Sequence, residues 1–371
     1  YIFYLSKFLV KNGIDVSIVS SLPPDLKSKN ESFEGIKYHF IKPNVTNKKL
    51  RSIWRNIYAI NLRKYIRNYD FDILHAYSGS DVNLSISKSS KFPFFIQPFG
   101  AEIITSPKNQ KILKGVNPFK KFYLNFFLIN PLLECCKKAN FVFSEYEDEN
   151  TDLAKLCKVS ENKITSLPIG LDLAQINIMK ARRCPFTNFT WNDSIKLLTV
   201  NRLDPVKGIN YLIDSLKLLA TSNTKFELIV VGDGPEYLNL KNQISDLNLN
   251  HVVHLVGEVS EDDLYSFYNI SDIYISPTLQ NDWIMGVADA LACGLPVVST
   301  GQGIIVKNGI NGLIINEKSS DSIVKGINTV LQNKTFRNKN LLIEINKPIL
   351  EMYDWDKIAK KAIRIYEKSL S

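Results

Sequence analysis

The feature that most constrains the fold of this chain is the regular alternation of strand-like and helix-like segments. Short runs rich in β-branched and aromatic residues predict strands at residues 15–20, 36–40, 72–76, 94–97, 141–144, 164–167, 196–200, 226–231, 252–256, 273–276, 296–299 and 313–315. Amphipathic helical patterns, such as residues 1–11 and 208–219, lie between most of them. Such alternation is typical of parallel sheets with helices on both faces, and two sets of six strands predict two doubly wound α/β domains.

The length of the chain agrees with two domains. At 371 residues it exceeds what one hydrophobic core usually serves. Residues 173–193 lack clear periodicity and contain Pro185, so we interpret them as the inter-domain linker. Doubly wound sheets bind ligands beyond the carboxyl ends of their strands. The loops that follow the strands, at a cleft between two facing domains, are therefore where we look for chemistry.

Charge and cysteine content narrow the class of protein. Residues 1–175 hold 25 of the 46 Lys and Arg but only 16 of the 37 Asp and Glu, so the whole excess of +9 lies in this half. The longest apolar stretch, residues 122–133, is interrupted by polar residues and is shorter than the roughly 20 residues of a membrane-spanning helix. Five cysteines without a C-x-x-C motif disfavour a disulfide framework or a zinc site and favour the reducing cytoplasm.

The segment at residues 197–210, LLTVNRLDPVKGIN, carries the most chemical information. A hydrophobic strand ends at Val200, a polar turn follows, and a helix begins near Lys207 and Gly208. Arg202 and Lys207 therefore lie on a strand-to-helix loop at the ligand end of the second sheet. Two cations beside the amides of a helix N-terminus can hold a phosphate or diphosphate. The alternative is that Arg202 and Lys207 are solvated surface cations without a ligand, which would give the same sequence pattern.

Three further segments follow strands of the second half. LIVVGDGP at residues 228–235 is a strand that ends in a glycine-rich turn, and in HLVG at 254–257 a glycine would let a flat base approach the backbone. Residues 271–300 read as strand, loop, helix and strand, with Asn281 and Asp289 eight residues apart around the start of the helix. Asp289 would point a carboxylate toward the same cleft as Arg202. The alternative is that Asp289 is a solvated helix position and Asn281 an N-cap.

In order, spacing and context these segments resemble the C-terminal half of family 4 glycosyltransferases, the retaining, nucleotide-sugar-dependent group with the GT-B fold. The family pattern is G-R-L-x-x-x-K-G, then V-G-D-G-P, a later Gly, and E-x7-E leading into A-x-x-G-x-P-V-V. The matching positions of this chain are Asn201-Arg202-Leu203 with Lys207-Gly208, residues 232–235, Gly257, Gly294 with residues 296–298, and Asn308-Gly309 with Asn311-Gly312-Leu313. Residues 12–19, 72–75, 144–145 and 168–172 match the first half more loosely.

The resemblance implies two Rossmann-like doubly wound domains that face each other across a cleft. Residues 1–175 would be the acceptor-binding domain, 176–353 the donor-binding domain, and 354–371 a closing helix that packs back on the first domain. The chain opens at Tyr1 inside a helical pattern, and in the family one strand and a Gly-Gly turn precede this point. We therefore expect the N-terminus to be partial.

The resemblance also assigns roles to residues. Catalysis falls to Arg202 and Lys207, donor binding to Asn201, Gly232, Gly257, Asn281, Gly286, Val287 and Asp289, and the acceptor side to Phe99, Gly100 and Glu102. The substrate would be a UDP-, GDP- or ADP-sugar, and neither a cofactor nor a metal is implied.

Three departures from the family pattern bear on catalytic rate more than on fold or nucleotide binding. The E-x7-E pair reads Asn281-x7-Asp289, in which the amide can still bond sugar hydroxyls and the carboxylate is one methylene short. Phe99 stands where many members have a histidine facing the sugar. Residues 300–304 are shorter than the family's glycine-rich loop and lack its acidic residue.

The implied reaction is transfer of a hexose from a nucleoside diphosphate to an acceptor hydroxyl with retention, in glycan, glycolipid or polysaccharide synthesis. Arg202 and Lys207 would stabilise the charge that grows on the departing diphosphate. The three departures motivate an alternative, a catalytically weakened nucleotide-sugar-binding relative that acts as a non-catalytic partner. A GT-B-type sugar-nucleotide epimerase would need carboxylates and histidines in the cleft that the sequence does not place.

The basic first half is where we expect the acceptor. Residues 48–69 place apolar and aromatic residues on one helical face and seven Lys and Arg on the other, and residues 111–138 mix phenylalanines with basic residues. Such segments can lie on an anionic membrane and bring a glycan or lipid-linked acceptor to the cleft, which would make the protein peripheral on the cytoplasmic face. The alternative is that the apolar face packs into the core and the basic face is exposed to solvent. Nucleic acid is disfavoured because no recognised nucleic-acid module is present.

Overall fold

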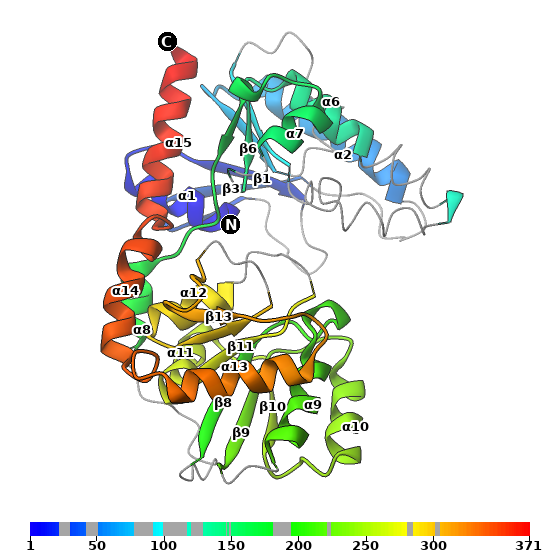
Figure 1. Cartoon of the computed structure of the whole chain (residues 1–371). Helices are drawn as coiled ribbons and strands as arrows, with labels where there is room; N and C mark the ends of the chain where they lie inside the picture. The colour runs from blue at the N-terminus through cyan, green and yellow to red at the C-terminus, as the bar shows by residue number, and fades with distance from the viewer. Residues whose placement is uncertain are drawn as a thin grey trace. The chain divides into compact units, whose positions relative to one another are not determined.

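The computed structural model describes residues 1–21, 30–41, 51–77, 92–98, 117–119, 129–145, 147, 150–180, 194–220, 224–279, 285–300 and 305–371. It comprises two compact units, which are labelled in Figure 1 by their helices and strands. The first unit is Tyr1–Gly170 together with Trp355–Ser371, and the second is Leu171–Asp354.

The second unit is built on a parallel six-stranded sheet in the order β10-β9-β8-β11-β12-β13. The strands are β8 (Ile195–Val200), β9 (Phe226–Val231), β10 (Val253–Gly257), β11 (Ile273–Ser276), β12 (Val297–Ser299) and β13 (Gly312–Ile314). All six strands expected for this half are confirmed to within one residue at each end. The order reverses between β8 and β11, which is the switch point where doubly wound sheets bind ligands.

Helices cover both faces of this sheet. They are α8 (Leu173–Lys180), α9 (Ile209–Leu219), α10 (Tyr237–Asp246), α11 (Glu261–Ile270), α12 (Met285–Ala292), α13 (Ser320–Gln332) and α14 (Lys339–Glu351). Alternate strand residues pack into two separate clusters: Leu197, Leu228 and Val230 lie with α9, α10 and α13. Leu198 and Ile229 lie with α8, α11 and α12 on the other face. Because β9 is buried on both faces, its sequence FELIVV is almost continuously apolar.

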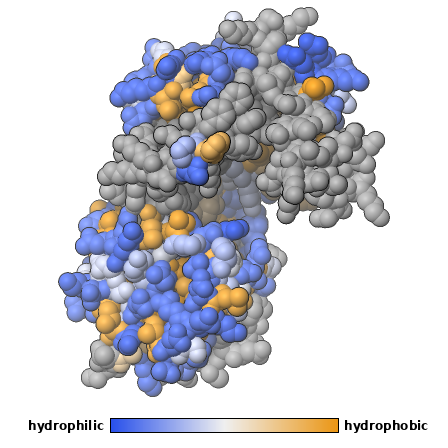
Figure 2. Space-filling model, turned by 90° about the vertical axis from the view of Figure 1, so that its right-hand side faces the viewer, coloured by the Kyte–Doolittle hydropathy of each residue, from blue (hydrophilic) through white to orange (hydrophobic). Residues whose placement is uncertain are grey.

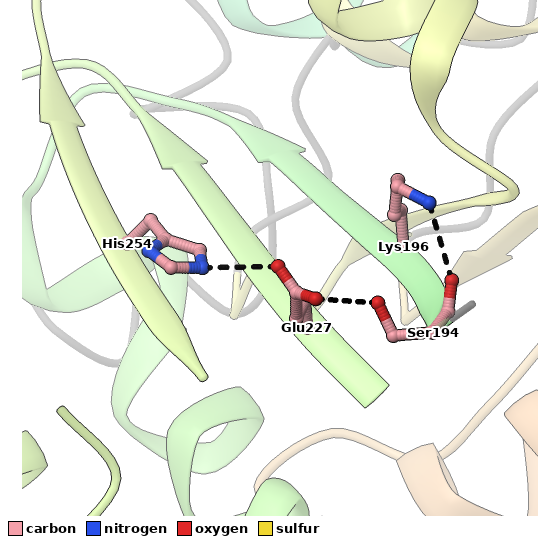
Figure 3. A network of polar contacts seen from close by, with 4 residues as sticks. All are labelled: Ser194, Lys196, Glu227 and His254. Carbon is pink, nitrogen blue, oxygen red and sulfur yellow. Dashed lines mark hydrogen bonds and ion pairs between the residues drawn. The ribbon is translucent and has the colours of Figure 1, made fainter. Parts of the chain in front are cut away.

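A polar network lies at the amino ends of three strands of this sheet, as Figure 3 shows. Glu227 accepts a hydrogen bond from the Ser194 hydroxyl at 2.5 Å on Oε1, and its Oε2 lies 3.2 Å from His254 Nε2. Lys196 Nζ donates to the Ser194 carbonyl at 3.3 Å. This network ties β8, β9 and β10 together at the edge opposite to their carboxyl ends.

The described residues of the first unit form two sheets. One is parallel, in the order β4 (Leu74–Tyr77), β5 (Phe94–Gln97), β6 (Phe141–Ser144) and β7 (Ile164–Ser166). The other has the order β1 (Ser17–Ser21), β3 (Ile36–Ile41) and β2 (Asn30–Phe33), with β2 antiparallel to β3. Strand β2 was not expected from the sequence, because its residues NESF are mostly polar and show no hydrophobic run.

Two clusters also form on the faces of the β4–β7 sheet. The helices that the described residues of this unit form are α1 (Ile2–Lys11), α2 (Arg51–Asn68), α6 (Asn130–Lys138), α7 (Asn150–Cys157) and α15 (Trp355–Leu370). Phe94, Ile96 and Val142 pack with α2, α6 and α7, whereas Phe95 and Phe143 pack with α1 and α15. The closing helix α15 therefore belongs to the core of the first unit although it comes last in the chain.

The stretch expected as a linker is partly helical. Residues 173–180 form α8, and Ile176 is buried in the core of the second unit. The short length of α8 and the small number of its core residues hide its periodicity in the sequence. Residues 181–193 lie outside the described part of the chain.

On the face shown in Figure 2, hydrophilic residues cover most of the described surface and hydrophobic ones occur among them in small groups. Scattered exposed apolar side chains are normal on a folded protein. Among the described helices, none combines the length and the apolar character needed to cross a lipid bilayer.

Candidate donor site

The loop between β8 and α9 has the geometry that the sequence predicts. The chain leaves β8 at Val200, passes through a short 3-10 helix at Pro205–Lys207, and enters α9 through Gly208. Gly208 has φ of +65°, and a Cβ on it would lie 2.1 Å from the Pro277 carbonyl oxygen. Only glycine fits here, because its backbone conformation is left-handed and the loop that follows β11 passes directly against its backbone.

Backbone hydrogen bonds hold the loops after β8, β9 and β11 together. The Asn201 amide donates to the Val231 carbonyl at 3.0 Å, and the Leu203 amide donates to the Asp233 carbonyl at 2.9 Å. On the other side, the Leu279 amide donates to the Val206 carbonyl at 2.7 Å. Three of the four sequence segments that suggested a site are thus joined to one another at the carboxyl edge of one sheet.

Arg202 is exposed on this loop and forms an ion pair inside it. Its Nε lies 2.6 Å from Asp204 Oδ2, and 71% of the Arg202 side-chain surface remains accessible. Asp204 was not among the residues expected from the sequence. The signal for this ion pair was an acidic residue two positions after the arginine. Lys207 is half-buried at the end of the 3-10 helix, next to the first turn of α9.

Gly232 and Gly257 meet across the ends of β9 and β10. The Gly232 amide donates to the Gly257 carbonyl at 2.8 Å, and a Cβ on Gly232 would lie 2.1 Å from the Asn201 carbonyl oxygen. Gly257 differs, since no described atom lies within 4 Å of the place where its Cβ would be. Gly232 is therefore required by packing, and Gly257 leaves open space beside the backbone.

Asp289 lies on α12 and is buried, with 7% of its surface exposed. The Tyr265 hydroxyl, from α11, donates a hydrogen bond to Asp289 Oδ1 at 2.9 Å. Burial raises the pKa of Asp289 to about 7, the hydrogen bond from Tyr265 opposes this rise, and nearby Glu261 adds to it. The alternative interpretation of Asp289 as a solvated helix position is therefore wrong. Tyr265 was not among the residues found from the sequence.

Gly286 and Val287 precede Asp289 in the first turn of α12. A Cβ on Gly286 would lie 2.2 Å from the Tyr274 hydroxyl, which itself donates to the Val200 carbonyl at 3.2 Å. The Val287 side chain is buried in the hydrophobic core. Both residues therefore have structural reasons for their identity, and a ligand could contact Val287 only through its main chain.

Four of the expected site residues lie outside the described residues: Phe99, Gly100, Glu102 and Asn281. Within the part of the chain that is described, no group of three His, Cys, Asp or Glu side chains is placed to hold a metal ion.

Two family profiles match this chain, one on each half. "Glycosyltransferase Family 4" matches residues 1–175, and "Glycosyl transferases group 1" matches residues 186–342. This chain belongs to the GT4 family of glycosyltransferases. The resemblance inferred from the four motif segments is thereby confirmed.

Curated relatives agree with this assignment. An uncharacterized glycosyltransferase of Methanocaldococcus jannaschii is 32% identical over 180 residues, which is 47% of this chain and 45% of the relative. The amylovoran biosynthesis glycosyltransferase AmsK of Erwinia amylovora is 23% identical over 84% of this chain and 82% of its own length. The chain thus spans about half the length of the first of these relatives and most of the second.

Solved structures with the same fold cover nearly the whole chain. Sucrose-phosphate synthase from Thermosynechococcus elongatus has a TM-score of 0.78 at 14% identity, over 99% of this chain and 92% of its own. HepE of Anabaena, solved in complex with UDP, has a TM-score of 0.66 at 16% identity, over 90% and 87% of the two chains. HepE was also solved in complex with UDP-glucose. The GT-B fold expected for this glycosyltransferase, with two Rossmann-like α/β domains, is confirmed.

Proposed function

We propose that this glycosyltransferase binds a nucleoside-diphosphate sugar at the carboxyl edge of the β8–β13 sheet. The observation that carries the proposal is the loop at residues 201–208, which bears an exposed Arg202 and, next to the amides that begin α9, Lys207. Cations and helix N-terminal amides together favour a diphosphate. The complexes of HepE with UDP and UDP-glucose support a donor of this class, which we expect to be a UDP-, GDP- or ADP-sugar.

The ion pair between Arg202 and Asp204 does not prevent this role. Exposed pairs of this kind contribute about 0–1 kcal/mol, whereas a charge-assisted hydrogen bond to a phosphate contributes about 1.5–3 kcal/mol. A diphosphate can therefore displace Asp204 from the guanidinium. Until the donor arrives, Asp204 compensates the charge of Arg202 and holds its side chain near the loop.

The proposed reaction is transfer of a hexose to an acceptor hydroxyl with retention of configuration. As the anomeric C–O bond breaks, negative charge grows on the phosphate oxygen that leaves. Arg202 and Lys207 stabilise that charge more in the transition state than in the ground state, which is the requirement for catalysis. The departing phosphate accepts the proton of the acceptor hydroxyl, so no protein base is required, and we propose that no metal ion or cofactor takes part.

We assign the remaining contacts from the resemblance to the family, supported at Asp289 and Gly257 by their positions at the same edge. Asp289 accepts a hydrogen bond from a ribose hydroxyl, and the open space beside Gly257 takes the base. Asn281 contacts the sugar. Phe99, Gly100 and Glu102 lie on the acceptor side. AmsK is named for amylovoran biosynthesis, which supports a role of this chain in glycan, glycolipid or polysaccharide synthesis.

Turnover and nucleotide binding test the proposal together. The full chain is incubated with UDP-, GDP- and ADP-sugars and a membrane extract, and the anomeric configuration of the product is read by NMR. Replacing both Arg202 and Lys207 by Ala should abolish nucleotide binding, whereas Lys217→Ala, at an exposed position near the end of α9, should leave it unchanged. Unchanged affinity of the double variant would contradict the donor site. Nucleotide binding without any turnover would favour the non-catalytic alternative.

We also propose a peripheral, cytoplasmic location, with the basic first unit on an anionic membrane. In the described part of α2, Leu62 and Ile66 pack into the core while Arg63, Lys64 and Arg67 are exposed. We propose that the contact is mainly electrostatic, since Leu62 and Ile66 are already used in the core. Binding to phosphatidylserine vesicles should weaken with salt and with Ala at the three basic positions. Binding that is indifferent to both would contradict the membrane contact.

A further inference from the structure

Three tyrosines lie near the buried carboxylate of Asp289. Tyr265 and Tyr268 come from α11 and Tyr274 from β11, and all three are buried. The ring centroids of Tyr265 and Tyr268 are 5.8 Å apart, and those of Tyr268 and Tyr274 are 5.9 Å apart. The Asp289 carboxylate thus lies in a largely aromatic environment.

The three hydroxyls have different partners. Tyr265 donates to Asp289 Oδ1 at 2.9 Å, and Tyr274 donates to the Val200 carbonyl at 3.2 Å. The Tyr268 hydroxyl is buried and has no hydrogen-bond partner among the described residues. Within that same part of the chain, Tyr265 is the one side chain that bonds the Asp289 carboxylate, and it bonds a single oxygen.

We propose that Tyr265 is the positioning residue of Asp289: its hydroxyl holds Oδ1 and leaves Oδ2 for a hydroxyl of the donor ribose. This inference rests on the proposed function, in which Asp289 binds the ribose. Without this hydrogen bond the plane of the Asp289 carboxylate could rotate about χ2, which is a broad torsion in Asp. A fixed donor on Oδ1 removes that freedom before the ligand binds, which lowers the entropic cost of binding.

The same hydrogen bond favours the ionised carboxylate. The ionisable groups that act on Asp289 or on its tyrosines in the described structure are Tyr265, Tyr268 and Glu261 of α11, Tyr274 of β11 and Cys293, which follows α12. Among them Tyr265 lowers the pKa of Asp289, against the rise caused by burial and by Glu261. Loss of the Tyr265 hydroxyl should therefore raise the pH at which Asp289 becomes an acceptor.

The test compares two variants that each lose one phenolic hydroxyl from the same buried helix face. Dissociation constants of UDP, GDP and ADP are measured by calorimetry from pH 5.5 to 8.5 for the wild-type chain, Tyr265→Phe and Tyr268→Phe. Tyr265→Phe should weaken binding about tenfold at pH 8 and move the midpoint of the pH dependence upward by half a unit or more. Tyr268→Phe should stay within twofold of wild type with an unchanged midpoint, because its hydroxyl has no described partner to lose.

Each outcome decides one of the two proposals. If the wild type binds a nucleotide and Tyr265→Phe has the wild-type affinity and midpoint, the positioning role is wrong while the donor site stands. Equal effects of the two variants would mean that general packing rather than the hydrogen bond is responsible, which also contradicts the inference. If the wild type binds none of the three nucleotides, the proposed function fails and the role of Tyr265 fails with it.

Discussion

Replacing Asp289 by Asn should stabilise the second unit, and more so at high pH than at low pH. Burial raises the pKa of Asp289 from 3.8 to about 7. A carboxyl whose pKa is raised by folding favours the folded state while it is protonated, and that contribution is lost as the pH rises through the folded pKa. Three pKa units correspond to about 4 kcal/mol. Asn carries no charge at any pH, and its amide oxygen can still accept the Tyr265 hydrogen bond.

The advantage of Asp289→Asn over wild type should therefore grow from about 1–2 kcal/mol at pH 5 to about 4 kcal/mol at pH 8. For a unit of this size the gain in melting temperature should be about 5–10 °C larger at pH 8 than at pH 5. Differential scanning calorimetry of both chains at the two pH values measures it. Asp246→Asn, at an exposed position of α10, is the matched control and should change the melting temperature by less than about 1 °C. An Asp289→Asn effect that is equal at both pH values would refute the reasoning.

Three further predictions follow from the same site and its surroundings. Gly286→Ala should lower the free energy of unfolding by about 2 kcal/mol or more, because its Cβ would lie 2.2 Å from the Tyr274 hydroxyl. Adding Tyr274→Phe should recover part of the loss in melting temperature, and a double variant whose effects are strictly additive would contradict this. Glu227→Gln should lower the free energy of unfolding by about 1–2 kcal/mol, because Glu227 bonds Ser194 and His254. It should leave nucleotide affinity unchanged, because Glu227 lies at the amino edge of the sheet; weaker nucleotide binding would argue against a site at the carboxyl edge. Sugar transfer should be unaffected by EDTA, and loss of activity restored by a divalent ion would show that the metal-free proposal is wrong.

Much of the second unit could be predicted from the sequence because its strands are buried on both faces. Runs such as FELIVV in β9 and IYIS in β11 are almost wholly apolar, and glycines follow several of these strands. The strand-to-helix loop with Arg202 and Lys207 was found in the same way. Local sequence is sufficient for this loop, because the strand, the turn and the helix start are adjacent in the chain.

The missed features depend on contacts that the local pattern does not encode. Strand β2 pairs by its backbone with β3, so its polar side chains leave no hydrophobic signal. The role of Tyr265 requires knowing that α11 faces α12, since within the sequence it is one aromatic residue among several in EDDLYSFYNI. The burial of Asp289 likewise comes from neighbours distant in the chain.

Hydrogen–deuterium exchange of the full chain with and without nucleotide tests the central claim most directly. With whichever of UDP, GDP and ADP binds, we expect slower amide exchange at residues 201–208 and 286–289, on the carboxyl edge of the second unit's sheet. Residues 225–228 and 252–254, at the amino edge, should exchange at unchanged rates. Protection confined to the amino edge, or to the first unit, would contradict the donor site.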